Sequence, residues 1–265
     1  NISFLHSANK GKSILAYNPA AKFSSSNLKS FKKFTEKHKK HLLIGYLSYD
    51  LAYQLYNIKA KAKDDLNLPK IYFHAYKNWR EISEANFSDQ NKAGYFQSQN
   101  LNTTTAKHPF GTKFKAVTSK AAYSAAYKKI ENYIKKGEVY QLNLSHRLEA
   151  RSNIPPKELF LKILKANPVD YSAYLEGENF EILSASPENF IKIKNNLIET
   201  NPIKGTRPRG KTSKQDKKLA NELLKSPKEA AELNMITDML RNDLAKVCKP
   251  GSVKVQKLRN LQKCP

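Results

Sequence analysis

Cysteine is scarce in this sequence, and its scarcity narrows the class of protein. Only Cys248 and Cys264 occur among 265 residues. Two thiols are too few for a disulfide framework, and no cluster of Cys and His has the spacing of a zinc site. A reducing, cytoplasmic setting is therefore expected.

Long apolar runs are also absent from the sequence. No run approaches the ~20 residues that cross a bilayer. The stretch from Asn1 to His6 lacks the basic region and long apolar region of a signal peptide. We expect no membrane partner and no secretion. Because the chain does not start with methionine, further residues are expected before Asn1.

Acidic residues are few, with 23 Asp and Glu against 47 Lys and Arg, for a net charge of +24. Such a charge is typical of proteins that bind nucleic acid. Here the lysines are spread over the whole chain, and lysine outnumbers arginine, whereas arginine dominates base recognition. We interpret the charge as a solvated surface that would also attract a small dianionic substrate, with no nucleic acid as partner. A basic nucleic-acid-binding module is kept as a rival interpretation.

The remaining composition is that of a folded protein. Hydrophobic residues make up 40% of the chain, and its length suffices for one large domain or two closely packed ones. The polar segment 84–112 is rich in Asn, Gln, Ser and Thr, which indicates an exposed connection. We place a domain boundary there, which predicts an N-terminal subdomain over 1–112 and a second domain over 113–265.

Residue periodicity predicts strands in runs with helices between them, which indicates an α+β fold. Strands are predicted at 1–17, 42–56, 139–145, 171–176, 180–185, 189–194, 197–200 and 252–255. Segment 68–73 is predicted to be a loop that enters a further strand. Helices are predicted at 27–40, 119–136, 155–165, 213–225 and 227–246.

A basic loop carries the strongest chemical signal. Residues 201–210 read Asn-Pro-Ile-Lys-Gly-Thr-Arg-Pro-Arg-Gly, so Lys204 is followed by Gly205 and then by two arginines. Glycine lets the backbone approach a ligand closely, and arginine forks match carboxylates. Neighbouring cations also favour the neutral amine form of a lysine. The pattern indicates an amine nucleophile beside an anion-binding loop; a solvated basic loop is the simpler alternative.

Two carboxylates are candidates to act with Lys204. Glu188, in a Ser-Pro-Glu sequence, precedes it by sixteen residues. On neighbouring strands of one meander it would face the lysine and could relay a proton; otherwise it lies in a surface turn. Glu232 adjoins the apolar stripe of the 227–246 helix, so it is expected to be partly buried and to have a partner. From the residues alone, an arginine is favoured over Mg²⁺ as that partner.

Five segments taken together resemble the chorismate-utilising enzymes. They are 137–145, 186–190, 202–210, 231–244 and 251–255, and their order and spacing also fit. The resemblance spans most of the chain, weakly before residue 110 and strongly after it. At the loop, anthranilate synthases look like Pro-Ile-Ala-Gly-Thr and aminodeoxychorismate synthases look like Pro-Ile-Lys-Gly-Thr. Lys204 therefore makes the chain similar to the aminodeoxychorismate branch, with anthranilate synthase component I as the alternative.

The resemblance implies an anthranilate-synthase-like fold of two stacked, mainly antiparallel sheets with helices outside. It also implies a reaction in p-aminobenzoate and folate synthesis. Lys204 would add to C2 of chorismate as the 4-hydroxyl leaves. Ammonia would then add at C4 and expel the lysine, giving 4-amino-4-deoxychorismate. Glu188 would assist proton transfer, Gly205 and Thr206 would hold substrate, and Glu232 would ligate Mg²⁺ on a substrate carboxylate. A separate glutamine amidotransferase subunit would supply the ammonia.

Two departures from the family modify these expectations. Family members continue beyond the position of Pro265, so the fold is expected to be C-terminally incomplete and the fragment inactive alone, or else a scaffold for the amidotransferase. An effector pocket in the family often contains Leu-Glu-Ser, where this chain has His6 before Ser7. Ser7, Tyr171 and Ser172 are the candidate effector-pocket residues.

Overall fold

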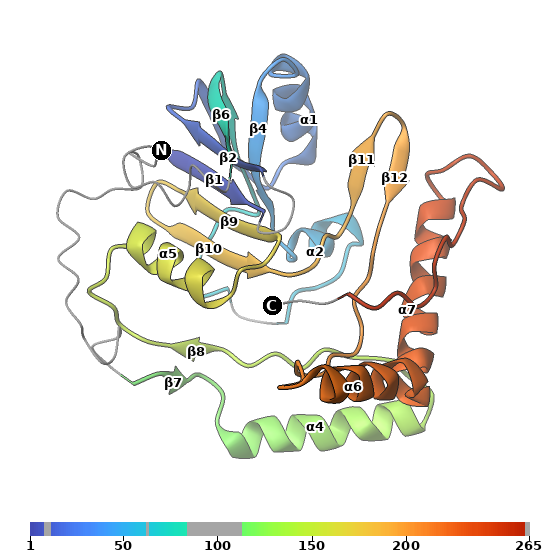
Figure 1. The fold of residues 1–265 in the computed structure, drawn as a ribbon. Coiled ribbons are helices and arrows are strands. Elements are labelled where there is room, and N and C mark those ends of the chain that lie inside the picture. The colour runs from blue at the N-terminus through green and yellow to red at the C-terminus, as the bar shows by residue number, and fades with distance from the viewer. Residues whose placement is uncertain (8–11, 62–63, 84–112, 263–265) are drawn as a thin grey trace. The chain divides into compact units, whose positions relative to one another are not determined.

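The structure, a computed structural model, describes residues 1–7, 12–61, 64–83 and 113–262. The chain forms two compact units, one made of residues 1–93 and 160–265 and the other of residues 94–159 (Figure 1). No helix within the described ranges is both long and apolar enough to cross a membrane. The boundary expected at residue 112 falls outside those ranges and stays a prediction.

The larger unit is built around a five-stranded antiparallel sheet in the order β10-β9-β1-β2-β6. These strands are β1 (Ile2–His6), β2 (Lys12–Tyr17), β6 (Asn78–Ser83), β9 (Tyr171–Glu176) and β10 (Glu181–Ser186). β1 is central, and its Phe4 pairs with Leu15 on one side and with Tyr174 on the other. The sheet therefore joins strands from both sides of the expected domain boundary.

A second antiparallel sheet, in the order β3-β5-β4, packs on the first. Its strands are β3 (Ala21–Ser25), β4 (Leu42–Leu47) and β5 (Ile71–Tyr76). Ala16 and Leu175 of the first sheet meet Ile44 and Tyr76 of the second in one apolar cluster. Because strand side chains alternate between faces, each sheet is left with an outer face to cover.

Helices cover these outer faces. α1 (Leu28–Lys37) lies on the three-stranded sheet, where the ring of Phe31 is centred 4.8 Å from that of Phe73. α5 (Pro156–Ala166) places the fully buried Phe160 against the five-stranded sheet, 6.2 Å from Phe4 and 5.6 Å from Tyr174 between ring centres. The expected α+β arrangement of two stacked antiparallel sheets with outer helices is confirmed.

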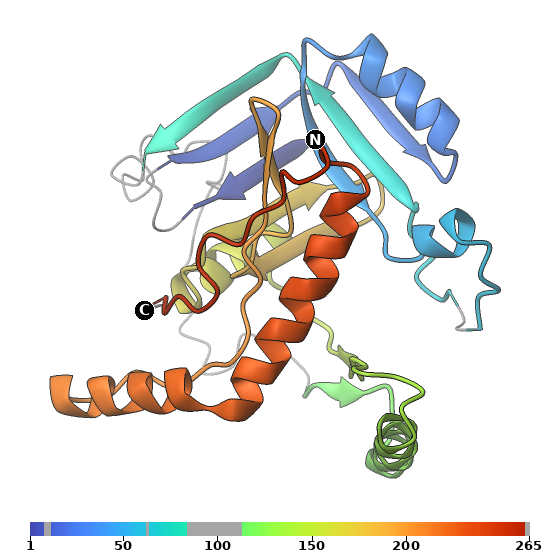
Figure 2. The same ribbon diagram turned by 90° about the vertical axis from the view of Figure 1, so that its right-hand side faces the viewer.

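The rest of the larger unit contains a hairpin and further helices. They are α2 (Leu51–Leu55), β11 (Lys192–Lys194), β12 (Leu197–Glu199), α6 (Ser213–Lys225) and α7 (Pro227–Ala245). The hairpin turns through Asn195 and Asn196, whose φ angles are 50° and 60°, as a type I′ turn requires. α6 leads directly into α7 (Figure 2). At the junction the Ser226 hydroxyl caps α7 by accepting from the Glu229 N–H.

The smaller unit consists of α4 (Lys120–Lys135) and the short ladder of β7 (Lys115–Ala116) with β8 (Leu148–Glu149). Ser119 caps the helix by accepting from the Ala122 N–H at 3.2 Å. Gly137 follows its end with a φ of +72°, a conformation that glycine adopts readily. The helix expected at 119–136 is thereby confirmed.

Three strand predictions were wrong. Segments 139–145 and 252–255 form no strand, and the strand expected over 42–56 ends at Leu47, before α2. Alternation of apolar and polar residues indicates that a segment can form a strand. The segment forms one only where the edge of a sheet or another strand is there to pair with it. Within the described part of the chain neither 139–145 nor 252–255 has such a partner, and Tyr140 is 86% exposed.

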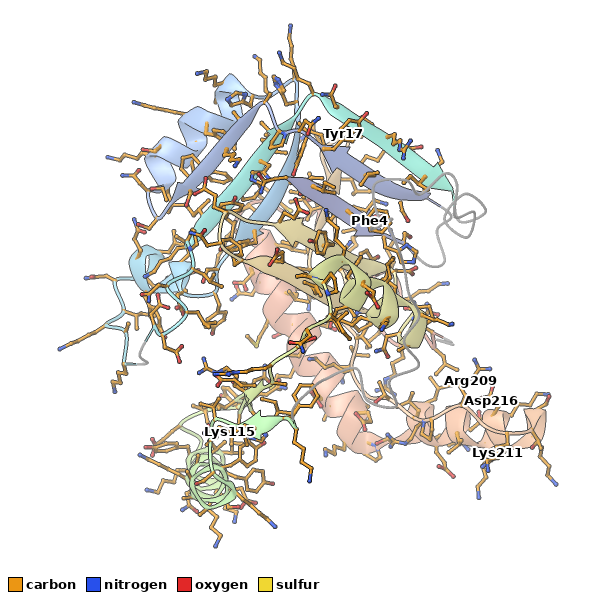
Figure 3. All side chains as sticks on the ribbon, turned by 90° about the vertical axis from the view of Figure 1, so that its left-hand side faces the viewer. Phe4, Tyr17, Lys115, Arg209, Lys211 and Asp216 are labelled. Atoms are coloured by element: carbon orange, nitrogen blue, oxygen red, sulfur yellow. The ribbon has the colours of Figure 1, made fainter. Side chains whose placement is uncertain are left out.

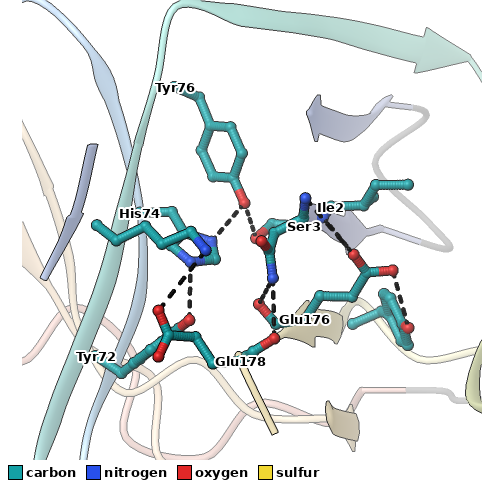
Figure 4. Close-up of polar contacts among 11 residues, drawn as sticks. Ile2, Ser3, Tyr72, His74, Tyr76, Glu176 and Glu178 are labelled. Carbon is teal, nitrogen blue, oxygen red and sulfur yellow. Dashed lines mark hydrogen bonds and ion pairs between the residues drawn. The ribbon is translucent and has the colours of Figure 1, made fainter. Parts of the chain in front are cut away.

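A chain of buried polar side chains runs between the two sheets (Figure 4). On β5, the Tyr72 hydroxyl lies 3.0 Å from Nε2 of His74, and Nδ1 of His74 lies 2.9 Å from the Tyr76 hydroxyl. That hydroxyl is 2.7 Å from Oγ of Ser3 on β1. All four side chains are buried. Since an unpaired buried polar group costs ~1–3 kcal/mol, the hydrogen bonds are what make this burial tolerable.

The same burial keeps His74 neutral. Burial above all, with the nearby charge of Lys22, lowers the pKa of His74 from 6.5 to about 4. Burial also raises the pKa of Tyr76 to about 12. A charged imidazole would have no carboxylate among its hydrogen-bond partners here, because both are tyrosine hydroxyls.

We expect His74 to make the fold sensitive to acid. Its folded-state pKa lies below the unfolded value, so its contribution is fully present above pH ~6.5 and is lost as the pH falls toward ~4. A shift of this size corresponds to a loss on the order of 3 kcal/mol. Urea unfolding from pH 8 to pH 4 measures it. In His74→Gln the slope of stability with pH over this window should flatten, whereas His146→Gln, at a histidine outside the buried core, should leave it unchanged. An unaltered slope in His74→Gln would contradict the assignment.

Candidate active site around Lys204

The β11–β12 hairpin brings Glu188 to the basic loop. The hairpin pairs Lys192 with Glu199, and extending that register places Glu188 opposite Ile203. There the Glu188 carboxylate accepts a hydrogen bond from the Ile203 N–H at 3.1 Å. Glu188 is thus held beside the backbone that leads into Lys204. That its carboxylate faces the Lys204 amine stays a prediction.

Gly205 packs the loop against α6 and α7. Its φ is +69°, in the left-handed region where other residues are strained. A Cβ at this position would lie 2.7 Å from Oε2 of Glu229 and 2.8 Å from Cδ1 of Leu223. The close approach of the backbone is made to the protein's own helices. The predicted approach to a ligand stays a prediction.

The two arginines of the loop are paired with carboxylates of the same helices. Nη1 of Arg207 lies 3.3 Å from Oε1 of Glu229 in the first turn of α7. Arg209 binds Asp216 in the first turn of α6 with both arms of its fork, at 2.8 and 3.1 Å. The carboxylates that these arginine forks bind belong to α6 and α7. Binding of a ligand anion by the loop stays a prediction.

Lys204 is half-buried, and Thr206 beside it is exposed. Within the described residues, no hydrogen bond or ion pair engages the Lys204 ammonium. The Thr206 carbonyl accepts a hydrogen bond from Arg207 at 2.8 Å. The reacting role of Lys204 and the substrate-holding roles of Gly205 and Thr206 stay predictions.

Glu232 lies on α7, one turn after Glu229, and is half-buried. Its single carboxylate suits Mg²⁺, which is commonly held by one or two carboxylates together with water and substrate oxygens. No group of three or more His, Cys, Asp or Glu side chains in the described ranges is arranged to hold a metal ion. Glu232 therefore fits as one ligand of a metal site, and its assignment to Mg²⁺ stays a prediction.

The candidate effector residues meet at one end of the five-stranded sheet. Ser172 is the register partner of His6, which precedes Ser7, and Tyr171 is the partner of Ser186. The buried Ser7 hydroxyl has no hydrogen-bond partner among the described residues. Ser172 is 1% exposed and donates to the Val169 carbonyl at 3.3 Å. Binding of an effector here stays a prediction.

Asp216 and Glu229 were missed by the sequence analysis, although each carries a recognisable signal. Each lies in the first turn of a helix, where a carboxylate interacts favourably with the helix dipole. Ser226 and Glu229 also have the spacing of a capping box. That pattern would assign Glu229 to its own helix end, whereas the folded chain turns it toward Arg207.

The sequence matches the model of the chorismate binding enzyme family over residues 1–265, so the chain belongs to that family. It is 37% identical over 240 residues to aminodeoxychorismate synthase component 1 of Bacillus subtilis, covering 83% of this chain and 51% of that protein. The corresponding Klebsiella aerogenes protein is 32% identical over 224 residues, covering 81% and 49%. Anthranilate synthase component 1 of Thermus thermophilus is 31% identical over 229 residues, covering 80% and 50%.

The chain spans about half the length of these curated relatives. Among solved structures, anthranilate synthase component I from Streptococcus pneumoniae superposes with a TM-score of 0.76 at 23% identity. That match covers 94% of this chain and 65% of the other. It supports the fold alone.

We expect Gly205→Ala to destabilise the larger unit more than a matched glycine replacement. Both Gly205 and Gly251 have positive φ, +69° and +74°, but an added Cβ would meet neighbours within 4 Å at Gly205 and none at Gly251. Overpacking costs ~1–3 kcal/mol beyond the backbone strain. Urea unfolding followed by fluorescence of the single tryptophan, Trp79, compares Gly205→Ala with Gly251→Ala. Equal losses in the two variants would show that the loop does not pack against α6 and α7.

Proposed function

We propose that this chain forms the Lys204-bearing part of an enzyme that converts chorismate and ammonia to 4-amino-4-deoxychorismate. The Lys204 amine adds to C2 of the substrate, and the 4-hydroxyl leaves as water. Ammonia then adds at C4, and the C2–N bond to the lysine breaks, which regenerates the amine. The reaction needs no oxidant or reductant.

One observation carries this proposal. Lys204 stands in a Pro-Ile-Lys-Gly-Thr sequence whose backbone is hydrogen-bonded, one residue earlier, to the Glu188 carboxylate at 3.1 Å. An amine nucleophile and a proton-transfer group must lie close together, and this backbone contact keeps the two residues on adjacent segments. The 37% identity to an aminodeoxychorismate synthase component 1 supports the same assignment.

Glu188 is suited to handle the protons of this reaction. It lies in an exposed position, so it can exchange protons with solvent between the two half-reactions. In the first half-reaction it would donate a proton to the departing 4-hydroxyl. In the second it would accept one from the incoming ammonia, which returns the carboxyl to its starting state.

Glu232 would contribute one carboxylate to a Mg²⁺ ion. When bound, such an ion neutralises a substrate carboxylate and orients the ring. The half-buried position of Glu232 on α7 supports this assignment, as does the all-oxygen chemistry of the donor.

The ammonia would come from a glutamine amidotransferase subunit. The relatives are named as component 1, which supports a partner of this kind. We place the reaction in the cytoplasm, where free thiols such as Cys248 persist.

Anthranilate synthase is the second candidate function, because relatives with that name are about 30% identical. Lys204 distinguishes the two reactions, since it supplies the amine that the covalent route requires. The two candidates also differ in product, so a product assay separates them.

We expect the full-length protein, supplied with chorismate, ammonia and Mg²⁺, to form 4-amino-4-deoxychorismate. Chromatography with mass detection identifies this product, and fluorescence detects anthranilate. Direct formation of anthranilate without the 4-amino compound would contradict the proposed reaction. Omitting Mg²⁺ and adding a chelator should abolish turnover.

Lys204→Ala should lower formation of the 4-amino product by at least about a hundredfold, because the covalent route loses its nucleophile. Lys214→Ala, at an exposed lysine of α6, serves as the control and should retain activity. Full activity in Lys204→Ala would rule out a covalent role.

A further inference from the structure

Asp216 fastens one end of the basic loop to α6. Its carboxylate accepts from Nε and Nη2 of Arg209 at 2.8 and 3.1 Å and from the Gly210 N–H at 2.9 Å (Figure 3). The side chain of Asp216 is only 19% exposed. A charged acceptor with three donors, one of them backbone, fixes a loop more firmly than a single surface ion pair does.

The backbone itself touches α6 at this point. A Cβ at Gly210 would lie 2.2 Å from the Asp216 nitrogen, so only glycine permits the approach. Next along the chain, the Lys211 N–H donates to the Gln215 side chain at 2.9 Å. Residues 209–211 are therefore laid directly on the first turn of α6.

Glu229 holds the middle of the loop against α7. Its side chain is 18% exposed and lies 3.3 Å from Nη1 of Arg207. The same carboxylate borders Gly205, where a Cβ would come within 2.7 Å of Oε2. One acidic side chain thus contacts the loop at two positions, immediately after Lys204 and two residues further on.

Lys204 lies between these attachments and the one made by Glu188. On its N-terminal side the Ile203 N–H is bound by Glu188 at 3.1 Å. On its C-terminal side Gly205 packs on Glu229. The Lys204 backbone is consequently restrained at both flanking residues, and the direction of its side chain follows from that restraint.

We propose that Asp216 and Glu229 are positioning residues for Lys204, acting through Arg209, Gly210, Arg207 and Gly205. The expected loss of kcat rests on the proposed function. The expected loosening of the loop does not depend on it. Ion pairs that are partly exposed add little to global stability. Their loss is expected to loosen the loop and misplace the amine, and a displacement near 1 Å can cost ~100-fold in rate.

The test compares Asp216→Ala and Glu229→Gln with Glu222→Gln in the full-length protein. Glu222 is a matched control on α6, where it makes an exposed pair with Lys218 at 4.0 Å. We expect kcat to fall ~10- to 100-fold in the first two variants, with less than about a threefold change in KM for chorismate. Asp216→Asn should recover part of the lost kcat, because its amide oxygen can still accept from the Gly210 N–H.

Hydrogen exchange separates this inference from the proposed function. Backbone amides over residues 203–211 should exchange faster in Asp216→Ala than in Glu222→Gln, whatever reaction the protein catalyses. Suppose that the wild-type protein makes no 4-amino product while exchange is still faster in Asp216→Ala than in Glu222→Gln. That result would contradict the proposed function and support the attachment of the loop by Asp216. Unchanged exchange, or unchanged kcat in an active enzyme, would overturn the inference. Should Asp216→Ala unfold, Arg209→Ala removes the same ion pair from the loop side and is judged by the same outcomes.

Discussion

The pairing of β1 with β9 is the contact on which the rest of the larger unit depends. It ties Ser3 and Phe4 to Leu175 and Tyr174, about 170 residues later in the chain. On one face it lets Phe160 of α5 reach Phe4, and on the other it lets Ser3 reach Tyr76. β9 in turn carries β10, which ends at Ser186 and leads to Glu188. A local element of five residues therefore organises both the core and the approach to the candidate site.

The interface between the sheets combines apolar packing with a polar chain. Ala16 and Leu175 supply the non-directional part, while Tyr72, His74 and Tyr76 place three ring groups at alternate positions of β5. Side chains alternate between the two faces of a strand, so a slip of β5 by one residue would turn these polar side chains to the opposite face. Their hydrogen bonds would then be lost. The polar chain thus specifies which face of β5 packs on the first sheet. Apolar contacts alone would specify that face less strictly.

The cations of the basic loop differ in whether they are paired with carboxylates. Arg207 and Arg209 form ion pairs with the first turns of α7 and α6, and these contacts leave Lys204 with its backbone restrained and its ammonium unengaged by the described residues. Two of the three cations of the motif therefore act on the loop's conformation. The third, Lys204, is the residue to which the proposed reaction assigns the nucleophile.

Much of this arrangement follows from local patterns. The helices Lys120–Lys135 and Pro227–Ala245 each begin after a capping serine. The Asn195-Asn196 turn is a further local signal, and it carries Glu188 back toward Ile203. Local patterns do not predict whether a segment forms a strand when that depends on pairing with a distant strand. Segment 139–145 alternates like a strand, yet no edge in the described structure receives it.

The sequence by itself therefore determined the α+β class, the family and the identity of Lys204, Glu188 and Glu232 as candidates, because residue type and short-range spacing are sufficient evidence for these. Only the tertiary structure decided which carboxylates meet the loop arginines. Asp216 and Glu229 are first-turn acids by sequence, and their contacts with Arg209 and Arg207 depend on how two helices meet at Ser226. Contacts between separate elements depend on packing that no local pattern encodes.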